Sequence, residues 1–408
     1  MRGADRRVPG ASTLAVRVGR QQDLTDVHCE PIALTSAYVF ASAAEAAARF
    51  SGASPGNVYS RFTNPTVRAF EQRLAAMEGA EDGVAFASGM AAIAAIGHAW
   101  LQAGRNVVCS RDVFGTTLGA FRRYFGKFGV GVRLVDLTSL PQWQAAIDER
   151  TALVFVESPS NPVQRVGDIA RIARLAHAHG ALLVVDNTML TPIHQLPLGL
   201  GADLVLHSAG KYLDGQGRCV AGIVVGRESL MDELRGVLRT MGASLSPMNA
   251  WLLLKSLETL RLRVDAIHRA AGQLAQWLQA HPRVGQVHYT GLPTHPQHEL
   301  ALRQQAGHGG VVSFDVGRCQ ADAWRMMDAL KVVAIATNIG ETRTMVTHPA
   351  STTHGKLSVQ DRLEAGIGAQ LVRISVGLED PADLMADLDA ALASAPVAGL
   401  PVPQGTPA

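Results

Sequence analysis

Four short segments decide the fold: "ALVFVE" (152–157), "IARIARLAHAHG" (169–180), "ALLVVD" (181–186) and "ADLVLHS" (202–208). The first, third and fourth are continuous runs rich in Val, Leu and Ala, as strands buried on both faces of a parallel sheet require. The second carries apolar residues at helical spacing and closes on Gly180, a residue type that commonly ends helices. This repeated strand–helix–strand order predicts an α/β domain, with helices on both faces of a mostly parallel sheet.

The chain on either side extends this pattern. Apolar runs alternate with helix-length stretches from about residue 71 to 226, and a Pro-free segment at 249–282 predicts one long connecting helix. Strand-like runs at 309–316 and 371–380 predict a smaller C-terminal α/β domain. We therefore expect an N-terminal arm over 1–65, a large domain over 66–262, a small domain over 263–395 and a disordered tail over 396–408.

Composition and charge exclude several classes of protein. The 408 residues carry 37 Lys and Arg against 35 Asp and Glu, so no basic field favours nucleic acid or a membrane as a partner. The four cysteines form no C-x-x-C pair, so we expect neither a metal site nor a disulfide framework. The start of the chain has no apolar leader, which favours a cytoplasmic location. Only five basic residues are lysines, which limits the candidates for amine chemistry.

Polar residues follow three of the predicted strands, at the edge where doubly wound sheets bind ligands. Asp186 ends one strand, Ser208 and Lys211 follow the next, and Glu157 with Asn161 follows a third. Taken singly, each of them is also explained as a cap or turn residue.

A second signal is the segment "SGMAA" (88–92), where Ser88 and Gly89 open an apolar helix whose unpaired backbone N–H groups suit a phosphate. A phosphate cradle, a lysine amine and a strand-end aspartate together suggest pyridoxal phosphate, whose ring accepts electrons when a carboxylate keeps its nitrogen protonated. The alternative from another class is a non-catalytic nucleotide-binding or regulatory α/β protein. Against a dinucleotide site, the chain has no G-x-G-x-x-G at a strand–helix turn.

Seven motifs stand in order within a region from about residue 30 to 390: "VYSRFTNPT" (58–66), "SGMAA" (88–92), "ESPSNP" (157–162), "VVDNT" (184–188), "HSAGKYLDGQGR" (207–218), "THPASTTHG" (347–355) and "VRISVGLED" (372–380). In sequence and spacing they resemble the cysteine/methionine-metabolism family of fold-type-I, pyridoxal-phosphate-dependent enzymes. The resemblance implies that family's fold, a large domain with a mostly parallel sheet and a smaller C-terminal α/β domain, and its cofactor, pyridoxal 5'-phosphate.

The resemblance also implies a role for each matching residue. Lys211 would bind the cofactor covalently and move protons, Asp186 would pair with the pyridine nitrogen, and Arg373 would clamp the substrate's α-carboxylate. Asn161 and Asn338 would complete the substrate site. The other cofactor-binding residues would be Ser88, Gly89, Met90, Phe114, Thr188 and Ser208, joined by Tyr59 and Arg61 from a neighbouring subunit. Shared sites of this kind imply a homo-oligomer, expected to be a tetramer built from dimers.

Four positions depart from the family's patterns. Phe114 stands where most members have a tyrosine on the cofactor, so this ring stacks but donates no hydrogen bond. Ala209-Gly210 precedes Lys211 where the usual Ser-x-Thr-Lys has a second hydroxyl. Thr337-Asn338-Ile339-Gly340 lacks the carboxylate of the Glu-Ser-Leu-Gly found in cystathionine γ-synthases and γ-lyases, and Thr116 replaces a cysteine of methionine γ-lyases.

These departures favour replacement at Cγ by sulfide, in which O-succinyl-L-homoserine and sulfide give L-homocysteine and succinate, a methionine-biosynthesis sulfhydrylase reaction. The alternatives within the family are sulfhydrylation of the O-acetyl ester, the cystathionine γ-synthase reaction and a γ-lyase reaction. The motifs do not indicate which residues read the succinyl carboxylate.

Overall fold

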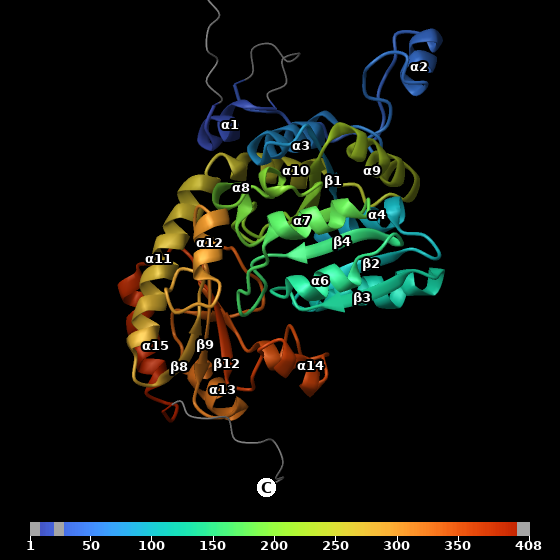
Figure 1. Cartoon of the computed structure of the whole chain (residues 1–408). Helices are drawn as coiled ribbons and strands as arrows, with labels where there is room; N and C mark the ends of the chain where they lie inside the picture. Colours follow the sequence, from blue (N-terminus) through green and yellow to red (C-terminus); the bar gives the residue numbers. More distant parts are fainter. Residues whose placement is uncertain (1–8, 20–27, 398–408) are drawn as a thin grey trace, which may run out of the picture.

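The structure, a computed structural model, describes residues 9–19 and 28–397 (Figure 1). It has two β-sheets, each covered by helices, which lie one above the other in Figure 1. Parts of two predicted segments lie outside the described residues: the arm at 1–8 and 20–27, and the tail from 398 onward.

The larger sheet has seven strands in the order β1-β7-β6-β5-β4-β2-β3. The strands from β6 to β3 run parallel to their neighbours, whereas β7 lies antiparallel to both β1 and β6. This confirms the predicted mostly parallel α/β sheet. The strands are β1 (Asp82–Phe86), β2 (Asn106–Ser110), β3 (Gly131–Val135), β4 (Thr151–Glu157), β5 (Leu182–Asp186), β6 (Leu204–Ser208) and β7 (Gly222–Gly226).

Successive residues of the central strands point into two separate cores, one on each face of the sheet. In β4, Val154 and Val156 belong to the core beneath α3, α7 and α10, while Leu153 and Phe155 belong to the core beneath α4 and α9. Both faces are therefore apolar, which explains the unbroken hydrophobic runs in the sequence. The helical elements before α11 are α1 (Ala11–Arg17), α2 (Ala43–Phe50), α3 (Pro65–Glu78), α4 (Gly89–Trp100), α5 (Gly115–Gly119), η1 (Ala120–Tyr124), η2 (Phe125–Phe128), α6 (Leu140–Ala146), α7 (Ile169–Ala178), α8 (Thr191–His194), η3 (Pro197–Leu200), α9 (Glu228–Met241) and α10 (Pro247–Leu257).

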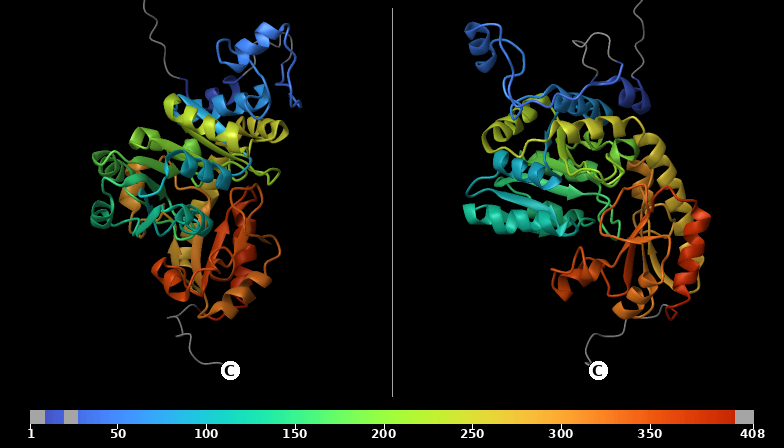
Figure 2. Two further views of the ribbon diagram at one scale, coloured as in Figure 1. Left: turned by 90° about the vertical axis from the view of Figure 1, so that its right-hand side faces the viewer. Right: turned by 180° about the vertical axis from the view of Figure 1, so that it is seen from behind.

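The smaller sheet has five strands in the order β10-β11-β12-β9-β8. Its core lies against α11, α13 and α15. The elements are α11 (Leu260–Ala280), β8 (Val284–His288), α12 (His298–Gln304), β9 (Val311–Val316), α13 (Gln320–Asp328), β10 (Ala334–Ile335), β11 (Met345–Thr347), η4 (Pro349–Ser351), α14 (Val359–Glu364), β12 (Leu371–Ser375) and α15 (Pro381–Leu392). Helix α11 joins the two halves, because its first turns belong to the core of the larger sheet and its later turns to this one (Figure 2).

The prediction of one continuous helix over 249–282 is wrong, because the chain forms two helices there. These are α10 and α11, and they are separated at Glu258 and Thr259. The carbonyl of Ser256 would accept from residue 260 in a continuous helix. Instead it accepts a hydrogen bond from Arg263 Nη2 at 3.0 Å and from the Thr259 N–H at 3.2 Å. A side chain that comes from the next helix thus ends α10, which no local helix propensity signals.

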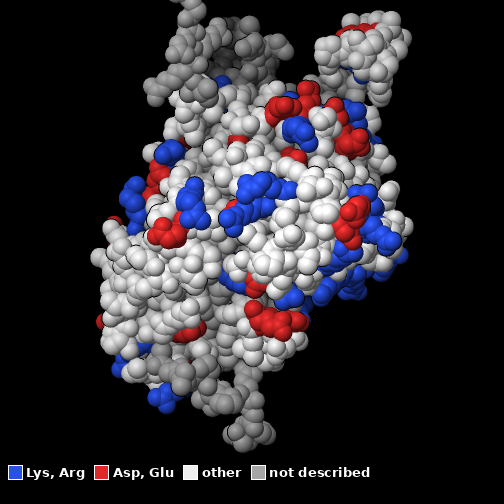
Figure 3. Space-filling view, viewed as in Figure 1, with Lys and Arg blue, Asp and Glu red and all other residues white. Residues whose placement is uncertain are grey.

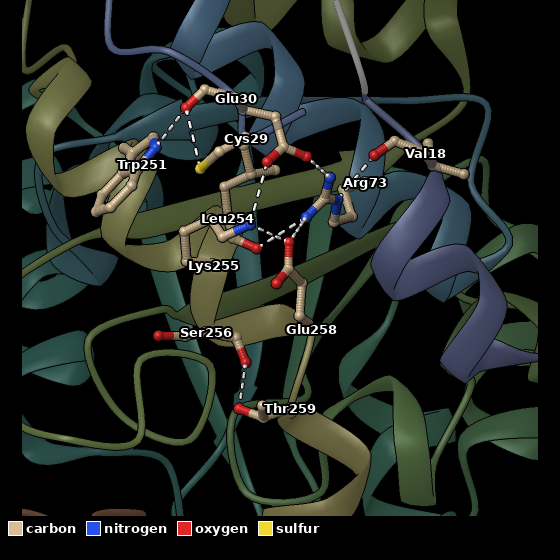
Figure 4. Close-up of polar contacts among 10 residues, drawn as sticks. All are labelled: Val18, Cys29, Glu30, Arg73, Trp251, Leu254, Lys255, Ser256, Glu258 and Thr259. Atoms are coloured by element: carbon tan, nitrogen blue, oxygen red, sulfur yellow. Dashed lines mark hydrogen bonds and ion pairs between the residues drawn. The ribbon is translucent and has the colours of Figure 1, made fainter. Parts of the chain in front are cut away.

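A buried arginine fixes the N-terminal segment onto the larger sheet's helices (Figure 4). Arg73 in α3 is fully buried and donates from Nε to the Val18 carbonyl at 2.7 Å and from Nη1 to the Leu254 carbonyl at 3.0 Å. Its Nη2 lies 2.7 Å from Glu30, whose other oxygen is 3.1 Å from Lys255 Nζ. One guanidinium thus joins α1, the segment after it, and α10.

Charged side chains of both signs are spread over the face drawn in Figure 3, with a denser group of Lys and Arg at its lower right. In the described part of the chain, no helix combines the length and the apolar character needed to cross a bilayer.

Candidate active site

The polar residues predicted at the strand ends meet at one edge of the larger sheet. Strands β4, β5 and β6 are parallel neighbours, and their register places Glu157 opposite Asp186, with Asp186 opposite Leu206, two residues before Ser208. Because all three strands end at this edge, they present their last side chains to one volume, as expected for a doubly wound sheet.

A cavity of about 150 Å³ opens at this edge. It brings together eight of the predicted site residues: Gly89, Met90, Phe114, Asn161, Asp186, Thr188, Ser208 and Lys211. Lys211 is the one lysine of the five that lines it. Residues that sequence reasoning gave no role complete the lining: Ile93, Thr117, Glu157, Met189, Leu206 and Ile339.

One end of the cavity is built for an anion. Helix α4 begins at Gly89, and the Ser88 hydroxyl caps it by accepting from the Ala91 N–H at 3.0 Å. A Cβ on Gly89 would lie 3.0 Å from the Ser208 Cβ, and one on Gly222 would lie 2.3 Å from the Ser88 carbonyl oxygen. The two glycines let the helix start approach β6 and β7, and Gly89 and Met90 of its first turn line the cavity. The N–H groups at the start of a helix suit a phosphate.

The middle of the cavity holds an amine, a carboxylate and a ring. Lys211 Nζ lies 5.8 Å from the centroid of the Phe114 ring. Asp186 accepts a hydrogen bond from the Thr188 N–H at 3.0 Å, and the Thr188 hydroxyl accepts from the Ser208 N–H at 2.8 Å. Thr188 therefore connects the ends of β5 and β6 and fixes the aspartate relative to the phosphate end. An amine, an aspartate, a ring for stacking and a phosphate cradle are the groups that pyridoxal phosphate needs, and they fit it.

The α-carboxylate clamp predicted at Arg373 comes from the smaller sheet. Arg373 in β12 is buried; its Nη1 donates to the Asn161 side-chain oxygen at 3.2 Å, and its Nη2 donates to the carbonyls of Thr337 and Asn338 at 2.9 and 3.0 Å. Its Nε is buried without a hydrogen-bond partner among the described residues. Burial lowers the pKa of Arg373 to about 10, so it stays charged at neutral pH.

Asn338 takes a different position from the one the sequence suggests. Its side chain donates to Glu341 at 2.7 Å, and only its backbone carbonyl contacts Arg373. Its contribution to the clamp is thus the orientation of Arg373.

Glu157 is a site residue whose role sequence reasoning missed, although its place at a strand end was visible. It is buried in the cavity wall, and its Oε2 accepts the backbone N–H of Phe114 at 2.8 Å. Burial, together with the charge of Asp186, raises the pKa of Glu157 to about 8. The Glu157 carboxyl is thus held toward its neutral form.

Tyr59 and Arg61 do not line the cavity of their own chain. Tyr59 is exposed, and the Arg61 guanidinium lies 5.6 Å from its ring centroid and 5.1 Å from that of Phe62. They lie on the segment between α2 and α3.

The two sheets and this constellation of residues define a pyridoxal-phosphate-dependent enzyme of the fold-type-I class. Residues 12–393 match the family described as "Cys/Met metabolism PLP-dependent enzyme". The chain belongs to that family, which confirms the predicted resemblance and the predicted cofactor.

Similar proteins cover nearly the whole chain. An O-succinylhomoserine sulfhydrylase of Pseudomonas aeruginosa is 55% identical over 94% of this chain and 95% of its own length, and one of Mycobacterium tuberculosis is 42% identical over 93% and 95%. An L-methionine gamma-lyase of Pseudomonas putida is 41% identical over 95% and 98%. The crystal structure of metB from Corynebacterium glutamicum superposes with a TM-score of 0.88 at 34% identity, covering 94% of this chain and 98% of that one.

Proposed function

We propose that the protein catalyses replacement at Cγ of O-succinyl-L-homoserine by sulfide, which gives L-homocysteine and succinate. A C–S bond forms at Cγ as the C–O bond to succinate breaks. The observation that carries the proposal is the 55% identity over nearly the whole chain to an O-succinylhomoserine sulfhydrylase. The cavity that gathers Lys211, Asp186 and the phosphate cradle supports it.

Each end of the cavity has a distinct task in this proposal. Ser88, Gly89, Met90 and Ser208 would hold the cofactor's phosphate, Asp186 would pair with its ring nitrogen, and Lys211 would hold the cofactor through its amine. When bound, pyridoxal phosphate supplies an electron sink for negative charge that develops on the substrate. Arg373 and Asn161 orient the α-carboxylate, and the unpaired Nε of Arg373 is one donor still free to bind it.

Lys211 is the group we assign to proton transfer. The ionisable residues that line the cavity are Lys211, Glu157 and Asp186, and the Glu157 carboxyl already accepts from the Phe114 N–H. Asp186 is assigned to the ring nitrogen, and Phe114 has no ionisable group. The Lys211 amine is thus left to take a proton from the substrate's Cα and to return it.

The methionine γ-lyases stand as the second candidate function because of their 41% identity. Thr116 argues against it, since it stands where methionine γ-lyases carry a cysteine.

We further propose a homo-oligomer, in which Tyr59 and Arg61 complete the phosphate end of a neighbouring subunit's site. Tyr59 is exposed, and neither residue lines the cavity of its own chain, which supports this. We place the protein in the cytoplasm, because all four cysteines are unpaired in the structure, as thiols are in reducing compartments.

The test uses purified protein loaded with pyridoxal phosphate and assays O-succinyl- and O-acetyl-L-homoserine, each with sulfide or cysteine. We expect the highest kcat/KM for the succinyl ester with sulfide. Preference for the acetyl ester, for cysteine, or for elimination without a nucleophile would overturn the assignment. Lys211→Ala should abolish the visible absorbance of the bound cofactor, whereas Arg373→Ala should retain it and raise KM.

A further inference from the structure

A second hollow adjoins the cofactor cavity, between the two halves of the molecule. Asn161 lines both of them. Phe114 lines the cofactor cavity, and the next residue, Gly115, lines the second hollow. On the larger-sheet side the second hollow is formed by the end of β2 and the loop after β4. On the other side it is formed by the segment around α14, which lies below the larger sheet in Figure 1. It lies beside the α-carboxylate clamp, since Asn161, which accepts a hydrogen bond from Arg373, is part of its lining.

Arg111 lines this hollow as the first residue after β2. Its backbone N–H donates to the Val135 carbonyl at 2.9 Å, which fixes the main chain at this point. Its side chain is exposed and makes no hydrogen bond or ion pair with any residue the structure describes. The adjacent acid, Asp112, is already paired with Arg165 at 3.2 Å, so it does not neutralise Arg111.

We propose that Arg111 binds the distal carboxylate of the substrate's succinyl group and so determines the preference for a dicarboxylic acyl ester. This inference rests on the proposed function. O-succinyl-L-homoserine carries two carboxylates, of which Arg373 takes the α-carboxylate, so the other needs a second cation. Lys211 is committed to the cofactor, which leaves Arg111 as the free cation at the adjoining hollow.

The hollow is small, about 20 Å³, so the part of the acyl group between the ester and the carboxylate would lie along its mouth. His354 does not compete as a cation, since burial and the charge of Arg373 lower its pKa to about 4. Apolar groups that suit the two methylenes come from Val113, Leu118, Pro162, Val163, Leu357 and Ile367. A planar guanidinium at the open end suits bidentate binding of a carboxylate.

The experiment measures kcat/KM with saturating sulfide for three esters: O-succinyl-, O-butyryl- and O-acetyl-L-homoserine. The butyryl ester matches the carbon chain of the succinyl ester without its charge. We expect Arg111→Met to lower kcat/KM for the succinyl ester about 10- to 100-fold, mainly through KM, and to leave the other two esters within about threefold. Arg111→Lys should recover part of the loss, because it restores charge but not the planar fork.

The matched control is Lys356→Met, which removes the same charge from an exposed residue next to Leu357 without touching the lining. An equal loss in this control, an equal loss on all three esters, or an unchanged succinyl value would overturn the role of Arg111. Cofactor absorbance and the thermal midpoint of each variant verify folding. Wild-type enzyme that does not prefer the succinyl to the butyryl ester also overturns the role of Arg111, whereas wild-type enzyme that prefers the acetyl to the succinyl ester refutes the proposed function itself, independently of the variants.

Discussion

Replacing Arg73 by methionine tests how strongly one buried guanidinium holds the N-terminal segment to the molecule. Methionine keeps most of the length and the apolar stem but removes every donor. The carbonyls of Val18 and Leu254 lose their hydrogen bonds, and Glu30 loses its nearest cation (Figure 4).

We expect the variant to lose about 3 kcal/mol of unfolding free energy. Removing one partner of a buried ion pair costs about 3 to 5 kcal/mol. The lower end applies here, because Lys255 Nζ stays 3.1 Å from Glu30, and the Glu258 side chain, the other carboxyl at Arg73, is 28% exposed. Methionine still fills most of the volume, so a large cavity does not add to the cost.

The assay is urea unfolding followed by tryptophan fluorescence, at fixed protein concentration and with excess cofactor, since both affect the midpoint. Trp251 is a reporter within the cluster, as its Nε1 donates to the Glu30 carbonyl at 2.8 Å. A double-mutant cycle with Glu30→Gln isolates the pair, and we expect a coupling energy of about 1 to 3 kcal/mol. Arg17→Met, at the exposed end of α1, is the control.

Acidification gives the same prediction a second readout. Burial alone would raise the pKa of Glu30, but hydrogen bonds from Arg73 and Lys255 lower it to about 2. The stabilisation that this carboxylate provides is therefore present above its unfolded pKa of about 4.5 and is lost as the pH falls toward 2. The difference between wild type and Arg73→Met should shrink from pH 7 to pH 4. A loss below about 1 kcal/mol at pH 7, or the absence of coupling to Glu30, refutes this reasoning.

Three further predictions follow from the site and its surroundings. Gly222→Ala should weaken cofactor binding at least tenfold, because its Cβ would meet the Ser88 carbonyl; Gly236→Ala, which meets nothing within 4 Å, is the control in a spectroscopic titration of the apoenzyme. Glu157→Gln should keep most activity and Glu157→Ala should lose it, because Gln still accepts from the Phe114 N–H; equal activities in a steady-state assay would contradict this. Lowering the pH from 7 to 5 should destabilise the fold by about 1 to 2 kcal/mol for each histidine whose pKa burial lowers to about 4 in the folded chain, since the same histidine in the unfolded chain has a pKa of about 6.5. The urea midpoint measures this loss, and the histidines with this shift are His194, His288, His295, His308 and His354.

The sequence predicts the strand-end residues well because their positions depend on local pattern. Asp186 and Ser208 each end a buried apolar run, and parallel strands bring such ends together whatever the helices do. The break between α10 and α11 depends instead on Arg263, whose side chain reaches back to the Ser256 carbonyl. The spacing of apolar residues along the helix does not indicate such a contact.

The roles of Glu157 and Arg111 were out of reach for a related reason. From the sequence, a carboxylate at the end of a strand is most simply interpreted as a cap. The structure shows instead that Glu157 accepts the Phe114 N–H and lies opposite Asp186. Arg111 is one arginine among many in the sequence, and only the missing partner in space distinguishes it. Both assignments depend on which groups surround the side chain in space. The residues next to it in the sequence do not reveal those groups.

The bond between Arg373 and Asn161 joins a strand of the smaller sheet to the loop that follows β4 in the larger one. The substrate's α-carboxylate would bind at this same junction, so substrate binding and the relative placement of the two halves are one equilibrium rather than two. Helix α11 connects the two halves, since its first turns pack into one core and its later turns into the other. Substitutions along α11, far from any reacting atom, should therefore change the affinity of the protein for amino-acid carboxylates. That affinity in turn reports the relative position of the two halves.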